Sequence, residues 1–362
     1  MGLAVAGAGS LFYPACGTAR RRPVPGAGDA FLYHTGGCRL VRSAGEAQGW
    51  LMEEPELALV FVNYDSARWL RTALATAKQA TGNLNVELVV VDNFSPGEKE
   101  REWLREVGAE FGARILLLGK NLGYGAAANR GVAHTRAELV AVCNPDVRFT
   151  ARSLSRLTEF IRSQPDAGVV SPQLYYPDGT PQPSCRRLPR LRYLFWGRRS
   201  PFVRMFPRQA PAREFLYLDV WQSTQPVEVE AVIGTVMVFR RSAFAAVAGF
   251  DEGYFMFAED LDICDRLRRQ GWRVFLEPRA RVIHYYGAVR RRWRRWTEYQ
   301  RVRGLHRFFI QRSRVPGSLL LSALFAGYYF GLEALAVAGL GEFEYSWQKA
   351  GRAKGGGRIA PA

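Results

Sequence analysis

The clearest chemical signal in the sequence is a carboxylate at the end of an apolar run. The run ELVAVCNPDV (138–147) is typical of a buried strand, yet it closes on Asn144 and Asp146, which Pro145 holds apart. One carboxylate with a neutral amide nearby suits a hard cation such as Mg²⁺ or Mn²⁺, which takes few protein oxygens and completes its shell with substrate phosphates. A solvated turn at a strand end would leave the same pattern, so the NPD motif alone does not distinguish a metal site from a turn.

A second group of carboxylates lies in FMFAEDLDICDRL (255–267). Its apolar spacing predicts a helix that begins near Glu259, and carboxylates in a first turn suit the helix dipole. Two adjacent carboxylates in a partly apolar setting also raise the pKa of at least one of them, which makes Asp260 a candidate general base. His284, in the run RVIHYY (281–286), is either a metal ligand or a structural hydrogen-bonding residue.

Alternating strands and helices are predicted to position these residues. Segments of helical spacing separate the apolar runs ELALVFVNY (56–64), VELVVVDN (86–93), ILLLG (115–119) and ELVAVCNPDV (138–147). This alternation predicts an α/β fold with a Rossmann-like, mostly parallel central sheet and helices on both faces. Ligands of such sheets bind at the carboxyl ends of the strands, where Asn63, Asp92 and Asp146 stand. The placement favours a ligand site over solvated strand ends.

Beyond Asp166 the alternation gives way to a less regular pattern. Residues 175–202 are rich in Pro, Arg and aromatic residues, which is typical of a loop. Strand-like sequence returns at 227–241, and a short helix is predicted next. Two further strands are predicted at 272–278 and 281–287.

The stretch NLGYGAAANRG (121–131) raises a competing function. Gly123, Gly125 and Ala128 match the G-x-G-x-x-G/A dinucleotide pattern, and Asp146 lies downstream near the distance of about 20 residues expected for a ribose-binding acid. An NAD(P)-binding Rossmann oxidoreductase is therefore an alternative. Against it, the motif sits on the third strand–helix unit, and a dehydrogenase explains neither the AED helix nor the basic, apolar C-terminus.

The composition is that of a folded protein with a strong positive charge. Of 362 residues, 48% are hydrophobic and 23% charged, and 50 Lys and Arg against 33 Asp and Glu give a net charge of +17. The hydrophobic content excludes a disordered chain, and the charge favours an anionic partner. Five scattered cysteines without a CxxC pair suggest neither a zinc module nor a disulfide scaffold, and indicate reduced thiols in a cytosolic compartment.

The C-terminal part carries most of this charge beside an apolar segment. Residues 290–312 are strongly basic, and 318–340 are nearly all apolar apart from Glu333. The pattern predicts either a membrane span or a helix lying in the interface. A buried pair of helices is an alternative, as is nucleic-acid binding, in which Trp293 and Trp296 would stack on bases.

Taken in order, these motifs resemble those of the family 2 glycosyltransferases of the GT-A fold, in particular the rhamnosyltransferase-like branch. The matching strings cover about residues 57–287 and read VFVNYDSARWL, VVVDNFSPG, GKNLGYGAAANRG, VCNPDV, PDGTPQPSCRRLP, GTVMVFRRSAF, GFDEGYFMFAEDLDICDRLRRQGW and VIHYYG. The ordered set is specific, although each string alone is not. The resemblance implies an inverting transfer from a nucleotide-diphosphate sugar, with L-rhamnose as the sugar that the branch suggests.

The resemblance also implies roles for individual residues. Asp146 would hold a divalent cation, Mg²⁺ or Mn²⁺, with His284 as the second metal contact, and Asp260 would deprotonate the acceptor hydroxyl. The expected nucleotide-sugar-binding residues are Asn63, Tyr64, Asp92, Asn93, Asn121, Gly123, Gly125, Asn129 and Asn144. Glu259, Asp262 and Arg186 would stand behind the catalytic groups or beside the acceptor.

Three features depart from the family pattern. Residues 1–51 have no counterpart in the family. NPD has one acid where a DxD element has two, which leaves a single strong metal ligand. After His284 the chain reads YYGAVRRR, where small residues are more typical, so the loop over the donor is expected to differ.

The resemblance, together with the composition of the N-terminal and C-terminal parts, predicts domains and partners. Residues 1–55 are expected to be a disordered extension, or to result from an upstream misassignment of the start with Met52 as the true initiator. A GT-A domain is expected at 56–289, with a nucleotide-sugar half (56–165) and an acceptor and catalytic half (166–289). A membrane-associating region is expected at 290–362. The expected partners are a dTDP- or UDP-sugar, a lipid-linked glycan acceptor and an anionic membrane, but no nucleic acid. This places the protein in cell-envelope glycan synthesis at the cytoplasmic face of the cell membrane, either peripheral or with one C-terminal hydrophobic segment. A catalytically dead GT-A binding module is a further alternative.

Overall fold

The structure is a computed structural model. It describes residues 34–35, 38–40, 54–190, 193, 209–220, 223–285, 294–312, 320, 323–324, 327–328 and 331, all within one compact unit, Leu32–Ala362. Most of the expected N-terminal extension and most of the apolar segment 318–340 lie outside these residues. In the part of the chain that is described, no helix is long and apolar enough to cross a membrane.

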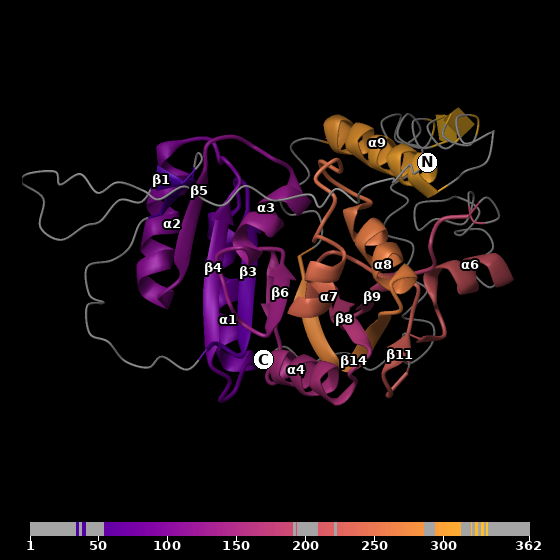
Figure 1. Ribbon diagram of the computed structural model, residues 1–362, viewed down its shortest axis with the longest axis horizontal. Helices are drawn as coiled ribbons and strands as arrows, with labels where there is room; N and C mark the ends of the chain where they lie inside the picture. Colours follow the sequence, from indigo (N-terminus) through magenta and orange to yellow (C-terminus); the bar gives the residue numbers. More distant parts are fainter. Residues whose placement is uncertain are drawn as a thin grey trace, which may run out of the picture. The chain divides into compact units, whose positions relative to one another are not determined.

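The N-terminal half of the domain is a parallel sheet with helices on both faces (Figure 1). Its strands lie in the order β5-β4-β3-β6, and its elements are β3 (Leu57–Asn63), α1 (Ala67–Ala80), β4 (Val86–Asp92), α2 (Glu98–Phe111), β5 (Arg114–Leu118), α3 (Tyr124–Val132) and β6 (Leu139–Cys143). Phe61 of β3 packs in a core with α1 and α2, whereas Val60 and Val62 pack with α3. Because both faces are buried, these strands are continuous apolar runs, as the sequence predicts.

The C-terminal half continues the same sheet with mixed strand directions. β13 (Val236–Arg240) lies antiparallel between β6 and β8 (Ala167–Tyr175), and β14 (Arg273–His284) runs parallel to β8. The two strands expected at 272–278 and 281–287 form one strand, β14, whose register shifts between Glu277 and Arg281. Pro278 lies in this shift, and a proline has no N–H to donate to the ladder.

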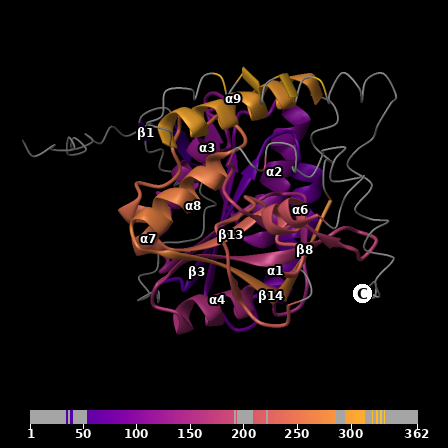
Figure 2. The same ribbon diagram turned by 90° about the vertical axis from the view of Figure 1, so that its right-hand side faces the viewer.

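The remaining elements complete the sheet and cover its ends. The sheet also contains β1 (His34–Thr35), β2 (Cys38–Leu40), β7 (Val147–Phe149), β9 (Pro181–Gln182) and β11 (Val227–Glu228), and β10 (Cys185–Arg186) pairs separately with β12 (Ala231–Val232). The other helices are α4 (Ser153–Ser163), α6 (Ala210–Leu216), α7 (Arg241–Ala246), α8 (Glu259–Arg269) and α9 (Arg294–Arg312). Figure 2 shows α9 lying across one end of the sheet, above α3 and α8. The predicted helix beginning near Glu259 is confirmed as α8.

Candidate active site

A cavity of about 570 Å³ opens at the carboxyl ends of the strands. Ten of the predicted site residues line it: Tyr64, Asn93, Asn121, Gly123, Asn144, Asp146, Arg186, Glu259, Asp260 and His284. A largely apolar part of the wall adds residues that the sequence analysis did not single out as site residues, including Pro189, Tyr193, Phe215, Leu216, Phe257, Trp296 and Leu305. One cavity therefore joins the NPD strand end, the AED helix and the RVIH strand end.

Asp146 and His284 are brought together by strand pairing. β7 follows the NPD motif and pairs antiparallel with the end of β14, so that His284 lies opposite Val147. The buried side chains meet with Nε2 of His284 3.5 Å from Oδ1 of Asp146. On the far side of the ring, Nδ1 lies 2.8 Å from Oε1 of Gln182. An N–H on Nδ1 would donate to this amide oxygen, and Nε2 would then be the ring nitrogen that could bind a metal beside Asp146.

This pair fits a divalent cation. One carboxylate oxygen and one imidazole nitrogen lie close together at a buried cavity wall, and the amide oxygen of Gln182, which can accept from Nδ1, orients the ring from its far side. Among the described residues, no group of three or more His, Cys, Asp or Glu side chains could hold a metal. Any cation here would therefore depend on substrate phosphates or water for its remaining ligands.

Asp260 sits at the start of α8 with both carboxylate oxygens occupied. Nη2 of Arg186 lies 3.0 Å from each oxygen, the backbone N–H of Gly234 donates to Oδ2 at 3.2 Å, and that of Leu261 donates to Oδ1 at 2.8 Å. Thr235, which follows Gly234, accepts a hydrogen bond at its backbone carbonyl from the backbone N–H of Asn144. The segment 234–235 therefore connects the AED helix to the NPD strand end.

Glu259, beside Asp260, has a strongly raised pKa. Burial, and then the neighbouring charge of Asp260, raise its pKa to about 8. Its Oε2 atom is buried without a hydrogen-bond partner among the described residues. The direction agrees with the expectation that at least one of the two adjacent carboxyls has a raised pKa, and it favours the protonated form of Glu259.

The backbone before α8 is held in an unusual conformation. Phe257 and Ala258 have φ angles of 68° and 67°, a left-handed region that L-residues enter at a cost. The carbonyl of Phe255 accepts a hydrogen bond from the backbone N–H of Tyr124 at 2.9 Å. A Cβ at Gly123 would lie only 2.4 Å from that carbonyl oxygen, so the glycine permits the loop before α8 to approach α3.

Two asparagines order the glycine loop. The Asn93 side chain donates to Oδ1 of Asn121 at 2.9 Å and accepts from the backbone N–H of Leu122 at 2.8 Å. Oδ1 of Asn121 also accepts from the backbone N–H of Gly123 at 3.0 Å. The loop is thereby fixed at the cavity wall.

Asn63 and Asp92 lie behind the cavity in a buried network. The Asn63 side chain donates to Oδ1 of Asp92 at 3.0 Å and to Oε1 of Glu100 at 3.2 Å. Glu100 also accepts from the backbone N–H groups of Ser66 and Ala67, both at 2.7 Å, at the start of α1. Sequence reasoning missed Glu100, because EKEREWL is typical of an exposed helix.

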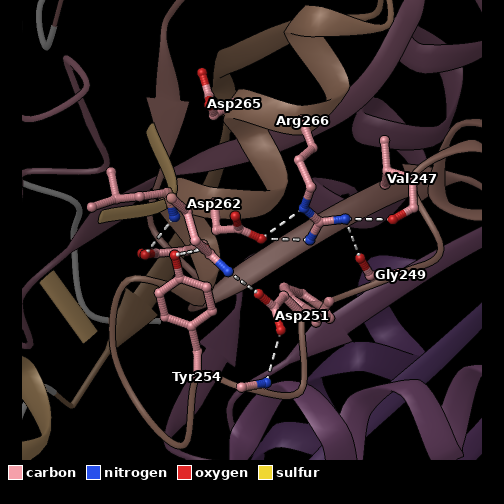
Figure 3. Close-up of polar contacts among 12 residues, drawn as sticks. Val247, Gly249, Asp251, Tyr254, Asp262, Asp265 and Arg266 are labelled. Carbon is pink, nitrogen blue, oxygen red and sulfur yellow. Dashed lines mark hydrogen bonds and ion pairs between the residues drawn. The ribbon is translucent and has the colours of Figure 1, made fainter. Parts of the chain in front are cut away.

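Asp262 and Asn129 lie outside the cavity lining, as does Gly125. Figure 3 shows Asp262 paired with Arg266, whose guanidinium also reaches the backbone carbonyls of Val247 and Gly249. Burial raises the pKa of Asp262 even with this partner. Asp262 thus holds Arg266, and the carbonyl contacts of Arg266 fix α8 to residues 247–249, away from the cavity.

Comparisons with known proteins agree with this architecture. The model described as Glycosyl transferase family 2 matches residues 58–246, and that of Glycosyl transferase family group 2 matches 189–343. The chain is 32% identical over 240 residues to the N-acetylglucosaminyl-diphospho-decaprenol L-rhamnosyltransferase of Mycobacterium tuberculosis, covering 63% of this chain and 76% of that one. It is 46% identical over 57 residues to the rhamnosyltransferase WbbL of Escherichia coli, covering 16% and 22%.

A solved structure supports the fold. The crystal structure of GalNAc-T7 with UDP, GalNAc and Mn²⁺ matches with a TM-score of 0.51 at 15% identity, covering 82% of this chain and 57% of that one. The fold is that of a GT-A glycosyltransferase. The chain belongs to glycosyltransferase family 2, as the sequence motifs predict.

Proposed function

We propose that this glycosyltransferase moves a sugar from a nucleotide-diphosphate sugar to a hydroxyl group of a lipid-linked acceptor, with inversion at the anomeric carbon. The observation that carries the proposal is that the Asp146–His284 pair and Asp260 line one cavity at the strand ends. A carboxylate–imidazole pair suits a diphosphate-bound cation, and a separate carboxylate suits proton abstraction.

The donor would lie in the part of the cavity formed by the N-terminal half. Tyr64, Asn93 and Asn121 would contact the nucleotide, and Asn144 would contact the diphosphate beside Asp146. Asp146 and His284 would hold Mg²⁺ or Mn²⁺, which when bound stabilises negative charge on the departing diphosphate. Because the Asn93–Asn121 contact already orders the glycine loop, this wall is preorganised for the donor.

Asp260 would act as the base. The acceptor oxygen forms a bond to the anomeric carbon as the bond from that carbon to the diphosphate oxygen breaks. The hydroxyl proton passes to Asp260. Attack from the side opposite the leaving group inverts the configuration.

The acceptor class is inferred from the relatives and from the cavity. Two relatives are named rhamnosyltransferases, and one name specifies a diphospho-decaprenol-linked acceptor. We therefore propose L-rhamnose as the donor sugar, with dTDP or UDP as its carrier, and a polyprenyl-diphosphate glycan as acceptor. Apolar residues such as Tyr193 and Phe215 would suit the first part of a lipid chain.

We also propose peripheral attachment at the cytoplasmic face of the membrane. α9 is strongly basic and exposes Trp296, Tyr299 and Ile310, a composition that suits an anionic lipid interface. Co-sedimentation with anionic vesicles, compared with neutral vesicles, tests this attachment. Equal recovery in both supernatants would contradict it.

The first experiment is a thermal-shift panel. Purified protein is heated with dTDP, UDP, GDP or NAD, each with and without Mn²⁺ or Mg²⁺, because ligands that bind only the folded state raise the melting temperature. Stabilisation by one nucleoside diphosphate that requires the metal is expected. Stabilisation by NAD alone would favour an oxidoreductase and contradict the roles of Asp146 and Asp260.

Two variants test the roles of the acids. Asp146→Ala is expected to fold, to lose metal-dependent stabilisation by the nucleotide and to lose transfer. Asp260→Asn is expected to keep that stabilisation while transfer falls by about 10²-fold or more. Full transfer by either variant would contradict the role of that residue.

A further inference from the structure

Every hydrogen-bond acceptor position of Asp260, the proposed base, is occupied. A carboxylate offers about four lone-pair sites. Those of Asp260 receive two contacts from Nη2 of Arg186 and one each from the backbone N–H groups of Gly234 and Leu261. An acceptor hydroxyl can transfer its proton to Asp260 only after one of these donors moves away.

Arg186 is the donor able to move. The N–H groups of Gly234 and Leu261 belong to the backbone of the 234–235 segment and of α8. Arg186 reaches Asp260 with a long side chain from the two-residue strand β10, and 31% of that side chain is exposed. It also lines the cavity. The saturation of Asp260 therefore depends on one side chain with access to substrate.

The guanidinium of Arg186 is incompletely bonded in this position. It meets Asp260 through Nη2, and its Nε is buried without a partner among the described residues. A phosphate group accepts two parallel hydrogen bonds from the Nε–Nη edge of an arginine. The neighbouring Arg187 also has a buried Nε without a partner among the described residues, but its Nη1 bonds Glu230, as does Nη2 of Arg190, so neither contacts Asp260. Arg186 is thus an arginine at the cavity wall whose bonding would improve on contact with a phosphate.

Resting on the proposed transferase function, we propose that Arg186 is a positioning residue that keeps Asp260 saturated until a phosphate oxygen of the bound lipid-diphosphate acceptor takes its guanidinium. Before that exchange, Asp260 cannot accept a proton from water. Hydrolysis of the donor would form a bond from the water oxygen to the anomeric carbon, break the bond to the diphosphate and pass the proton of water to Asp260. The contact with Arg186 therefore suppresses hydrolysis and favours transfer.

Three variants test this in two assays. Arg186→Gln removes the cation, Arg186→Lys keeps a cation without the two-pronged edge, and Arg187→Gln is the matched control on the adjacent residue. The first assay measures binding of inorganic pyrophosphate by calorimetry in buffer containing EDTA, which needs neither metal nor turnover. The second measures nucleoside diphosphate release from the donor, without and with the lipid-diphosphate acceptor.

Pyrophosphate binding is expected to weaken at least fivefold in both Arg186 variants and to change less than twofold in Arg187→Gln. The ratio of hydrolysis to transfer is expected to rise at least fivefold in Arg186→Gln and to stay near the wild-type value in Arg186→Lys. A rise in the acceptor KM is expected in Arg186→Gln. A rise in the donor KM alone would overturn the proposal, because a donor diphosphate that took Arg186 would release Asp260 to water before the acceptor binds.

The proposal is overturned if pyrophosphate binding does not depend on Arg186, whatever the turnover assay gives. It is also overturned if hydrolysis and transfer fall by the same factor in Arg186→Gln, because a purely structural support of Asp260 would act on both equally. Pyrophosphate binding through Arg186 by an enzyme that turns over no nucleotide sugar would instead contradict the proposed function.

Discussion

Gly304 of α9 lies directly against the backbone carbonyl of Phe257, two residues before Glu259. A Cβ at position 304 would stand 2.4 Å from the carbonyl oxygen of Phe257 and 3.4 Å from the Cβ of Ala258. Arg301, one turn earlier on α9, places its guanidinium over the Phe257 ring at 4.8 Å. α9 is therefore in contact with the strained backbone that delivers Glu259 and Asp260 to the cavity.

Gly304→Ala should displace this backbone. The clash is with a main-chain oxygen that cannot rotate away, so we expect a loss of about 1–3 kcal/mol in the free energy of unfolding, despite the better helix propensity of alanine. Misplacement of Asp260 should lower kcat by roughly tenfold or more. Denaturant unfolding and steady-state transfer measure both effects.

The control is Gly327→Ala, where a new Cβ would meet nothing within 4 Å. It should be neutral or slightly stabilising. Equal behaviour of the two variants would show that the contact between α9 and Phe257 does not position the acids.

Gln182→Leu tests the orientation of His284. Without Oε1 of Gln182, the ring of His284 loses the amide oxygen that lies 2.8 Å from Nδ1 and orients it. Metal affinity in the presence of nucleoside diphosphate should fall by about 10–100-fold. Electron paramagnetic resonance of free Mn²⁺ measures the change.

Gln182→Glu keeps an acceptor oxygen in the same place, so it should retain more of the metal affinity than Gln182→Leu. Unaltered metal affinity in the leucine variant would contradict the role of Gln182 in orienting His284.

Glu259→Gln should flatten the pH dependence of stability. The pKa of Glu259 is about 8 in the folded protein against an ordinary value of 4.5, because burial and the charges of Asp260 and Asp262 outweigh the favourable charge of Arg186. The unfolded chain therefore releases this proton first as pH rises, and stability falls between about pH 5 and pH 8. Glutamine does not titrate, and it mimics the protonated acid.

The variant should match the wild type near pH 5 and exceed it near pH 8, by no more than about 4 kcal/mol. Urea unfolding at several pH values measures the two slopes. Parallel slopes would mean that Glu259 is ionised in the folded protein.

The sequence predicted the fold and the strand-end groups well, because both follow from local pattern. The runs before Asn63, Asp92 and Asp146 alternate with helices, and parallel strands place their carboxyl ends at one edge. The candidate pairing of Asp146 with His284 came from family resemblance. In the structure it arises from β7 pairing with β14, a long-range contact that no local pattern encodes.

Other parts of the site could not be predicted for the same reason. Gln182 lies in a Pro-rich stretch without periodicity, and the buried position of Glu100 depends on where α1 begins relative to α2. The sequence of the basic stretch that includes α9 favoured membrane association. It gave no indication that Gly304 would contact the loop before α8. These contacts join elements far apart in the chain, whereas local sequence predicts only the type of each element and not its distant neighbours.

Asn129 and Asn121 provide the last prediction, because both were expected to bind nucleotide and the structure places them differently. Asn129 donates to the backbone carbonyl of Phe250 at 2.9 Å and accepts from its N–H at 3.0 Å, outside the cavity lining. Asn121 lines the cavity and holds the N–H of Gly123. Asn129→Ala should therefore cost about 1–3 kcal/mol of stability, because two backbone groups lose their partner. Its nucleoside diphosphate affinity should stay within about twofold of wild type, whereas Asn121→Ala should lose roughly tenfold, about the effect of one hydrogen bond at the wall. Chemical unfolding and nucleotide titration of both variants separate the roles, and equal loss of affinity in the two would return Asn129 to the nucleotide site.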